Sequence, residues 1–342
     1  MSAGGARVAF LGPEGTFTHQ AVLEWSARAG ARGPAPAHHA AGGSVALESV
    51  TQVHDAVASG AVDRGVVAVE SSVEGYVVPS LDALLGSRDV VAVDEVVLPI
   101  SFDAFVRPGH GELTEATAHP HGLAQVSRFV AERGLRPVPA SSNGAACRDV
   151  ADHQVAFGPR VCGELYGLET LAQQVEDFGG ARTRFLVLAR RDDAPAILAA
   201  ARAELGAPAP DPGGAAAPVP ATAAWRTMMA VTPVVTGPGV LARVTTAFGA
   251  RGINMTSLFE RPLKARANQY VFVVTFDAAP WDPDARALLA DLLAAGDSLK
   301  VLGVYPAQPG EGALDGVLPG HVPHGSVVAG ADDATLDRGL LW

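Results

Sequence analysis

The chain has few cysteines and few basic residues, and both scarcities exclude classes of function. Only Cys147 and Cys162 occur among 342 residues, and they lack CxxC spacing. Such a pair indicates neither a disulfide framework nor a zinc site, so we expect two buried thiols and no metal. Lysine and arginine together number 25 against 36 acidic residues, which gives a formal net charge of −11. Without a basic stripe, the protein is not expected to bind nucleic acid.

Long apolar runs are also missing. The start of the chain, 1–6, is small and polar and leads into the apolar segment 8–11, which is too short for a signal sequence or a membrane span. We therefore expect a soluble cytoplasmic protein with no membrane partner. The content of 48% hydrophobic and 18% charged residues is typical of packed domains, and the length allows two or three of them.

Residues 6–190 alternate short apolar segments with segments of helical period. This alternation predicts an α/β fold with parallel strands. The alternation is interrupted twice, by a long extended stretch at 90–106 and by a segment at 176–184. These interruptions predict two crossings between two α/β lobes, with a cleft between the lobes. The predicted boundaries are about 6–96 and 178–190 for lobe 1, and about 97–177 for lobe 2.

The remainder of the chain divides into three parts. Residues 191–225 are rich in Ala, Pro, Gly and Asp, which predicts a flexible linker. Residues 226–306 have the pattern βαββαβ, which predicts a small ferredoxin-like domain. From 307 to 342, Gly, Pro, Asp and His return without periodicity, so we expect a disordered tail.

Several short polar segments follow predicted strands or begin predicted helices. Thr16, in Gly-Pro-Glu-Gly-Thr-Phe, is placed to cap a helix whose free N–H groups face an anion, although a plain capped turn explains it as well. The segment 70–75, Glu-Ser-Ser-Val-Glu-Gly, ends a parallel strand, where α/β proteins commonly bind ligands; a capped strand end is the alternative. In lobe 2, Ser142 and Asn143 stand at another helix start.

Two histidines precede a helix in the segment His119-Pro-His121-Gly-Leu-Ala-Gln125. Histidines at i and i+2 do not share a helical face, and no third ligand has matching spacing, so we expect no metal here. His119 is better placed for a role at the helix entry.

The triplet Thr183-Arg184-Phe185 stands just before the apolar run 186–188. An arginine at the lip of a buried strand is costly to desolvate unless it is paired, so it commonly faces a cleft or an anion. A strand-edge arginine in water, with Thr and Phe as strand formers, fits the triplet equally. The polar segments from both predicted lobes favour the cleft.

In this order, the motifs resemble prephenate dehydratase with a C-terminal ACT regulatory domain, over about residues 7–305. The resemblance implies a two-lobed catalytic domain like that of periplasmic binding proteins, and a ferredoxin-like ACT domain. It also implies a carbon–oxygen lyase of phenylalanine biosynthesis, which converts prephenate to phenylpyruvate with loss of water and CO2. No cofactor is expected.

The resemblance further implies roles for single residues. Thr183 would be the catalytic donor to the leaving hydroxyl, with Glu70 or a water as proton relay. Arg184 would pair with a substrate carboxylate, and Phe185 would shape the ring pocket. The other expected substrate-binding residues carry hydroxyl, amide or imidazole groups: Thr16, Ser71, Ser72, His119, Ser142 and Asn143.

For the C-terminal domain, the resemblance implies L-phenylalanine as allosteric effector, bound between paired ACT modules, and hence a homodimer or homotetramer. A dimerisation module without an effector is the alternative. The expected effector contacts come from two loops of this domain: Gly239, Val240, Leu241, Asn254, Glu260 and Arg261.

Five positions depart from the family pattern. Ser71 replaces an Asn, His121 a Gln and Ala181 an Asn, and Phe259-Glu260 stands where the family has Glu-Ser before Arg-Pro. The change at position 71 removes one donor and shortens the reach. Two alternatives therefore stay open: a prephenate decarboxylase that leaves the ring non-aromatic, and a non-catalytic amino-acid sensor.

Overall fold

Lobe 1 is an open sheet with a parallel core, in a computed structural model that describes residues 6–31, 43–206, 225–262 and 270–308. The chain alternates strands and helices here because apolar strand residues such as Val8 and Val66 are fully buried between the covering layers. β1 pairs in parallel with β2 and β3, while β11 pairs antiparallel with β3 and β5. The elements are β1 (Val8–Leu11), α1 (Phe17–Ala31), β2 (Ser44–Leu47), α2 (Val50–Ala58), β3 (Arg64–Ser71), β4 (Gly75–Tyr76), α3 (Val78–Gly86), β5 (Val90–Pro99) and β11 (Arg182–Arg190).

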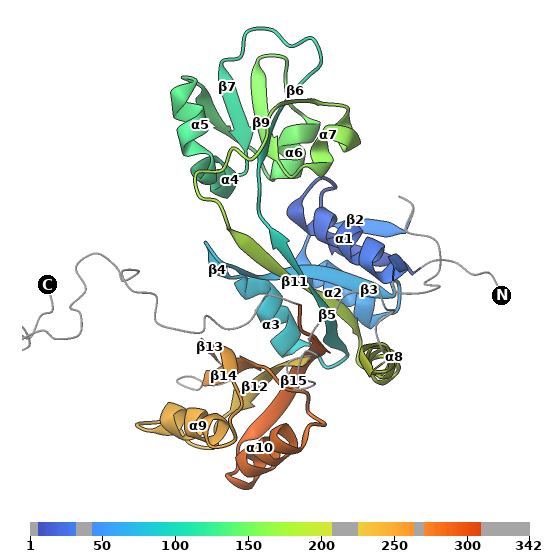
Figure 1. Ribbon diagram of the computed structural model, residues 1–342, viewed down its shortest axis with the longest axis vertical. Coiled ribbons are helices and arrows are strands. Elements are labelled where there is room, and N and C mark those ends of the chain that lie inside the picture. Colours follow the sequence, from blue (N-terminus) through green and yellow to red (C-terminus); the bar gives the residue numbers. More distant parts are fainter. Residues whose placement is uncertain (1–5, 32–42, 207–224, 263–269, 309–342) are drawn as a thin grey trace, which may run out of the picture. The chain divides into compact units, whose positions relative to one another are not determined.

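Lobe 2 is a separate, mixed sheet with strand order β10-β6-β9-β7-β8 among the described residues (Figure 1). The helix expected after His119 and His121 is divided at Val126 into α4 and α5. The elements are β6 (Asp103–Val106), β7 (Glu115–Ala118), α4 (Pro120–Gln125), α5 (Ser127–Glu132), β8 (Arg136–Pro139), α6 (Asn143–Arg148), β9 (Gln154–Gly158), α7 (Val161–Tyr166) and β10 (Glu169–Ala172).

The chain crosses between the lobes twice, as predicted. β5 runs directly towards β6, and the segment after β10 returns into β11 (Figure 1). The two crossings are hydrogen-bonded to each other, since Ile100 N donates to Ala181 O at 2.7 Å and Val175 N donates to Phe102 O at 2.8 Å. The two-lobed α/β fold is therefore confirmed.

The C-terminal domain has the predicted order βαββαβ and the strand order β13-β14-β12-β15. All three of its strand pairs are antiparallel, which gives the ferredoxin-like arrangement. Its core is buried between the sheet and two helices and includes Phe248 against Phe276. The elements are β12 (Trp225–Thr232), α9 (Val240–Gly249), β13 (Met255–Pro262), β14 (Tyr270–Phe276), α10 (Pro283–Ala294) and β15 (Ser298–Pro306).

The C-terminal sheet continues into the lobe 1 sheet, which the sequence did not predict. β15 meets β5 in parallel at the pair Gly303 and Ala92. A Cβ atom at position 303 would lie 2.7 Å from Ala92 Cβ, so only glycine permits this approach. Met228 and Tyr305 of the C-terminal domain are buried in the same apolar cluster as Leu84 and Leu186 of lobe 1.

The predicted linker is wrong at its beginning. Residues Ala194–Gly206 form helix α8, because the alanine-rich segment favours a helix and Pro195 stands in the first turn, where proline is tolerated. Its apolar residues pack on both domains: Ala194 and Ile197 on Val91, and Leu198 against the cluster of Trp225. The rest of the predicted linker, 207–224, and the predicted tail from 309 on lie outside the described residues.

The two cysteines are free and buried, as expected. The hydrogen bond with Cys162 is the largest cause that raises the pKa of Cys147 well above its usual range, and burial adds to the rise. Among the helices of the described segments, none is long and apolar enough to cross a membrane.

His54 gives the fold an acid-sensitive point. The side chain is 5% exposed, and its two ring nitrogens have no hydrogen-bond partner among the described residues. Burial lowers the pKa of His54 to about 4; Asp55 opposes this shift and Lys300 adds to it. Protonation therefore favours the unfolded chain, so the stability contributed by the neutral ring is complete above pH 6.5 and is lost as the pH falls towards 4.

We predict that His54→Leu reduces this acid sensitivity. Between pH 6.5 and 4, the free energy of unfolding should fall by roughly 3 kcal/mol less in the variant than in the wild type. Urea unfolding at a series of pH values measures the difference. His153→Asn, which removes an exposed ring, is the control and should keep the wild-type slope. Equal slopes for His54→Leu and the wild type would contradict the prediction.

Candidate active site

A cavity of about 530 Å³ lies between the lobes, at the ends of β3 and β11. Both lobes contribute to its wall, as expected for a cleft spanned by two crossings. Its lining residues are Phe17, Thr18, Ala68, Ser71, Glu74, Gly75, Tyr76, Val77, Val78, Pro79, Ile100, Phe102, His121, Gly122, Gln125, Asn143, Ala181, Thr183 and Phe185.

Thr183 and Phe185 face this cavity from the same side of β11. Side chains two residues apart in a strand share one face, which explains why they appear together. Thr183 is opposite Ser71 on β3 and Leu98 on β5. Directly opposite residues in antiparallel strands have Cβ atoms about 5 Å apart, so Thr183 and Ser71 are neighbours at one wall of the cavity.

Aromatic rings form the apolar part of the cavity. Phe17 and Phe102 meet edge to face with ring centroids 5.2 Å apart, one from each lobe. Phe185 is 1% exposed and is packed in the core cluster that both lobes share. The rings exclude water from one side of the cleft and provide a flat surface suited to a six-membered ring.

The polar part of the cavity contains hydroxyl, amide and imidazole groups. None of the described residues that line it is lysine or arginine. Asn143 stands at the start of α6, and its Oδ1 accepts a hydrogen bond from His119 N at 2.9 Å. His121 Nδ1 is 3.9 Å from Glu74 Oε2, which links lobe 2 to the β3–β4 hairpin across the cleft. Among the described lining residues, only His121 has a side chain that becomes positively charged on protonation.

The sequence interpretation missed several lining residues: Phe17, Thr18, Glu74, Tyr76, Phe102, His121 and Gln125. Phe17 and Gln125 stand inside motifs that were singled out, so their spacing was a usable signal. Tyr76 belongs to a two-residue strand, β4, that pairs with the end of β3 and has no comparable signal in the sequence.

Four predicted substrate-binding residues serve the backbone instead and are not among the lining residues. Each accepts a hydrogen bond at a helix start or a strand end: Thr16 Oγ1 from His19 N, His119 Nδ1 from His121 N, Ser142 Oγ from Ala145 N, and Ser72 Oγ from Arg182 N. The capping interpretation, kept open for Thr16 and for the segment 70–75, describes their contacts in this structure. Burial lowers the pKa of His119, and His121 lowers it further.

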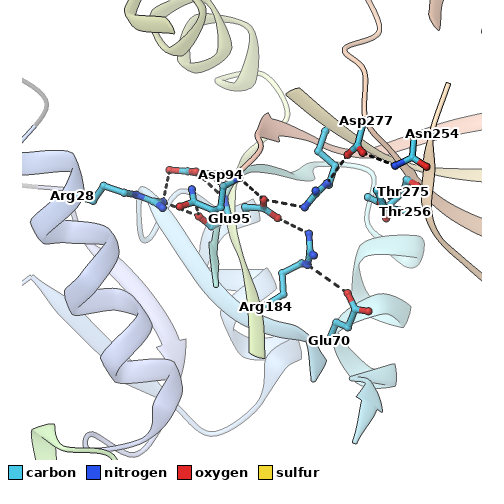
Figure 2. Close-up of polar contacts among 11 residues, drawn as sticks. Arg28, Glu70, Asp94, Glu95, Arg184, Asn254, Thr256, Thr275 and Asp277 are labelled. Atoms are coloured by element: carbon cyan, nitrogen blue, oxygen red, sulfur yellow. Dashed lines mark hydrogen bonds and ion pairs between the residues drawn. The ribbon is translucent and has the colours of Figure 1, made fainter. Parts of the chain in front are cut away.

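Arg184 points away from the cavity, contrary to its predicted role. The alternation of side chains along β11 places it on the face opposite Thr183 and Phe185. There its Nη1 lies 2.8 Å from Glu95 Oε2, and its Nε lies 3.4 Å from Glu70 Oε2 (Figure 2). Glu70, the predicted proton relay, is opposite Arg184 on β3 and shares this face. The sheet formed by β3 and β11 therefore lies between these two side chains and the cleft.

The ion pair of Arg184 continues into the C-terminal domain. Glu95 is fully buried, and its Oε1 lies 3.2 Å from Arg226 Nη1. Arg226, 2% exposed, reaches Asp277 at 3.2 Å, and Asp277 accepts a hydrogen bond from Asn254 at 2.8 Å. Figure 2 shows this series of contacts between Glu70 and Asn254. We call these six residues, Glu70, Arg184, Glu95, Arg226, Asp277 and Asn254, the interdomain ion network.

The six expected effector residues lie at the start of helix α9, just before β13 and on β13. Gly239 is the N-cap of α9 with φ +86°, a left-handed conformation that favours glycine. Val240 is buried, and Leu241 is exposed. Asn254 belongs to the interdomain ion network. Glu260 is exposed on β13, whereas Arg261 donates from Nε and Nη2 to Asp82 of α3 at 3.0 and 2.7 Å.

The lobes also touch at the loop 12–16. Tyr166 donates to Glu14 O at 2.8 Å, and Cys162 donates to Gly15 O at 3.1 Å. Burial raises the pKa of Tyr166 to about 12. A Cβ atom at position 144 would lie 2.4 Å from Glu14 O, so α6 requires Gly144 to approach this loop. These contacts fix the position of lobe 2 beside the start of α1.

We predict that Glu95→Gln destabilises the protein strongly. The substitution keeps the shape but removes the only negative charge shared by Arg184 and Arg226 in the described network. Breaking a buried ion pair on one side costs about 3–5 kcal/mol. Chemical unfolding measures the loss, with Glu132→Gln at an exposed position as the control. A loss below about 1 kcal/mol would show that the buried carboxylate is dispensable, since that is the range of surface pairs.

Comparison with known proteins places this geometry in a family. The family model described as prephenate dehydratase matches residues 8–193, which is more than half of the chain. The prephenate dehydratase of Amycolatopsis methanolica is 34% identical over 313 residues, covering 90% of this chain and 91% of that relative.

Two solved structures are similar over most of the chain. One is a prephenate dehydratase from Arthrobacter aurescens in complex with L-Phe, with a TM-score of 0.67 and 27% identity, covering 88% of this chain and 92% of that one. The other is GqqA, described as a novel type of quorum quenching acylase, with a TM-score of 0.70 and 24% identity, covering 88% and 98%. At that identity the second likeness shows a shared fold and no more.

Proposed function

The chain belongs to the prephenate dehydratase family, and we propose that it converts prephenate to phenylpyruvate in the cavity between its lobes. The observation that carries this proposal is the placement of Thr183 and Phe185 together in the interlobe cavity. The family membership favours dehydration over the two alternatives, decarboxylation to a non-aromatic product and amino-acid sensing without catalysis.

The reaction needs one proton and no redox partner. The bond from the ring to its carboxylate breaks, its electron pair enters the ring, and the ring hydroxyl leaves as water after accepting a proton. Prephenate dianion and one proton thus give phenylpyruvate anion, CO2 and water, and the aromatic ring formed is the driving force. The protein has to deliver the proton to the hydroxyl and hold the pyruvyl carboxylate.

Thr183 is the group proposed to donate to the leaving hydroxyl. An alcohol is too weak an acid to act alone, so its proton has to be replaced through a neighbour or a water. Ser71 is opposite Thr183 and lines the same cavity, whereas Glu70 faces the other side of the sheet. Ser71 Oγ accepts from Val73 N and Glu74 N, both at 3.3 Å, which leaves its own hydrogen available to Thr183. The relay is therefore proposed through Ser71 or water rather than Glu70.

The pyruvyl carboxylate is proposed to bind at the polar end of the cavity. His121, Gln125 and Asn143 line that part from lobe 2. The departing ring carboxylate becomes neutral CO2, so a fixed cation beside it would stabilise the starting state more than the transition state. Arg184 on the opposite face of the sheet avoids this penalty, and the rings of Phe102 and Phe185 suit a group that loses its charge.

We predict that Thr183→Ala lowers kcat for prephenate by at least about 100-fold, because general acid catalysis typically contributes that much or more. Thr183→Ser keeps a hydroxyl and should recover most of the rate. Phenylpyruvate is followed by its enolate absorbance in alkali, which a non-aromatic product would lack. Thr232→Ala, at the end of β12 in the C-terminal domain, is the control. A Thr183→Ala enzyme with an unchanged rate would remove Thr183 from the mechanism.

We infer that L-phenylalanine regulates the enzyme through the C-terminal domain. The support is its ferredoxin-like fold and the structural relative from Arthrobacter aurescens that contains L-Phe. The proposed contacts are the start of α9, with Gly239 as its N-cap and Leu241 in its first turn, and Asn254 before β13. A homodimer or homotetramer that pairs these domains is part of the proposal, and a plain dimerisation module is its alternative.

We predict that L-phenylalanine binds the wild-type protein and slows prephenate turnover. Asn254→Ala removes one amide donor and should weaken binding by roughly 10-fold, the effect of one good hydrogen bond. Calorimetric titration measures the affinity, and Thr245→Ala on the exposed part of α9 is the control. A wild-type protein that binds no L-phenylalanine would leave the dimerisation module as the explanation.

A further inference from the structure

The C-terminal domain contacts the wall of the cleft through one aromatic pair. Phe259 of β13 stacks on Tyr76 of β4, with ring centroids 4.3 Å apart and an angle of 29° between the planes. Tyr76 is one of the residues that line the cavity between the lobes. Phe259 of the C-terminal domain thus contacts a residue, Tyr76, that lines the cleft.

The wall that Tyr76 belongs to has little support of its own. Ser71 and the run Glu74–Pro79 line the cavity, and they belong to the β3–β4 hairpin and the start of α3. β4 has two residues, paired as Tyr76 with Glu70 and Gly75 with Ser71. So short a hairpin is not stable by itself, and its geometry depends on what packs against it. Val73 at its tip is 50% exposed.

Contacts on both sides of Phe259 hold it against the hairpin. Arg261, two residues along β13 and on the same face, donates two hydrogen bonds to Asp82 of α3. Ser257, two residues before, lines a small cavity of about 50 Å³ together with Tyr76, Glu70 and Arg184. Burial raises the pKa of the Tyr76 hydroxyl, and a hydrogen bond with the Ser257 side chain opposes the rise. β13 therefore contacts Tyr76 through Ser257 and Phe259, and it contacts α3 through Arg261 on the same face.

We propose that Phe259 is a positioning residue for the active site: by stacking on Tyr76 it holds the β3–β4 hairpin against the cleft, so that the C-terminal domain contributes to substrate binding. This inference rests on the proposed function for its kinetic readout. Phe259 touches no residue known to react, and it acts through Tyr76. Position 259 is also one of the five that depart from the family pattern, so the stack of Phe259 on Tyr76 is a feature of this sequence and not of the family pattern.

The first test compares Phe259→Leu with Phe259→Tyr in the full-length protein. Leucine keeps apolar contact but loses the stack, and KM for prephenate should rise about 2- to 10-fold, the range of one aromatic pair, with a smaller change in kcat. Tyrosine preserves the ring and should restore the wild-type KM. Phe248→Leu removes a ring from the core of the same domain without touching β4, and it is the control for general destabilisation.

The second test needs no activity. Hydrogen exchange of residues 71–77 should be faster in Phe259→Leu than in the wild type, and unchanged in Phe248→Leu. If the wild type does not consume prephenate, the proposed function fails while the exchange result still decides the role of Phe259. If the wild type is active but KM and hairpin exchange are the same in Phe259→Leu, the proposed function stands and the positioning role is overturned. Equal effects of the two leucine variants would also overturn it, because they would reflect domain stability alone.

Discussion

The buried carboxylate of Glu95 is the contact on which the arrangement of the domains depends. It lies on β5, the strand that pairs with β11 on one side and meets β15 of the C-terminal domain on the other. A fully buried charge is tolerated only when it is paired, and here it has two arginines, Arg184 and Arg226, one from each domain. Without the C-terminal domain, Glu95 would keep Arg184 but lose Arg226, and without lobe 1, Arg226 would keep only Asp277 among these contacts. The ion network therefore specifies how the two domains join.

This role explains why Arg184 does not face the cleft. In a strand, neighbouring side chains face opposite sides of the sheet, so β11 presents Thr183 and Phe185 to the cleft and Arg184 to the domain junction. The three-residue motif thus combines two functions on two faces. A change of register by one residue would exchange them, which makes the packing of β11 between β3 and β5 essential to the site.

The sequence predicted the elements and their order well, because strand and helix periods and the βαββαβ pattern are local signals. It also placed Thr183, Ser71, Asn143 and Phe185 among the cleft residues. Alternation along β11 separates Arg184 from Thr183 and Phe185, but the sequence could not show which face meets the cleft, because Glu95 and Arg226 at the domain junction are distant from Arg184 in the chain. Helix α8 was missed because an Ala/Pro composition is shared by linkers and helices. Residues such as Ser142 were assigned to substrate because a helix cap and a ligand contact use the same side chains.

Most of the departures from the family pattern lie at or next to the cavity between the lobes. Ser71, His121 and Ala181 all line the cavity, and Phe259 stacks on Tyr76, which lines it too. Together the first three replace amide side chains by a hydroxyl, an imidazole and a methyl group. The cavity thereby loses amide donors and gains an imidazole whose Nδ1 lies 3.9 Å from Glu74 Oε2 of the β3–β4 hairpin. Under the proposed function, anion recognition would therefore rest more on His121 and its contact with this hairpin than on amides, and it would depend on how firmly the hairpin is held.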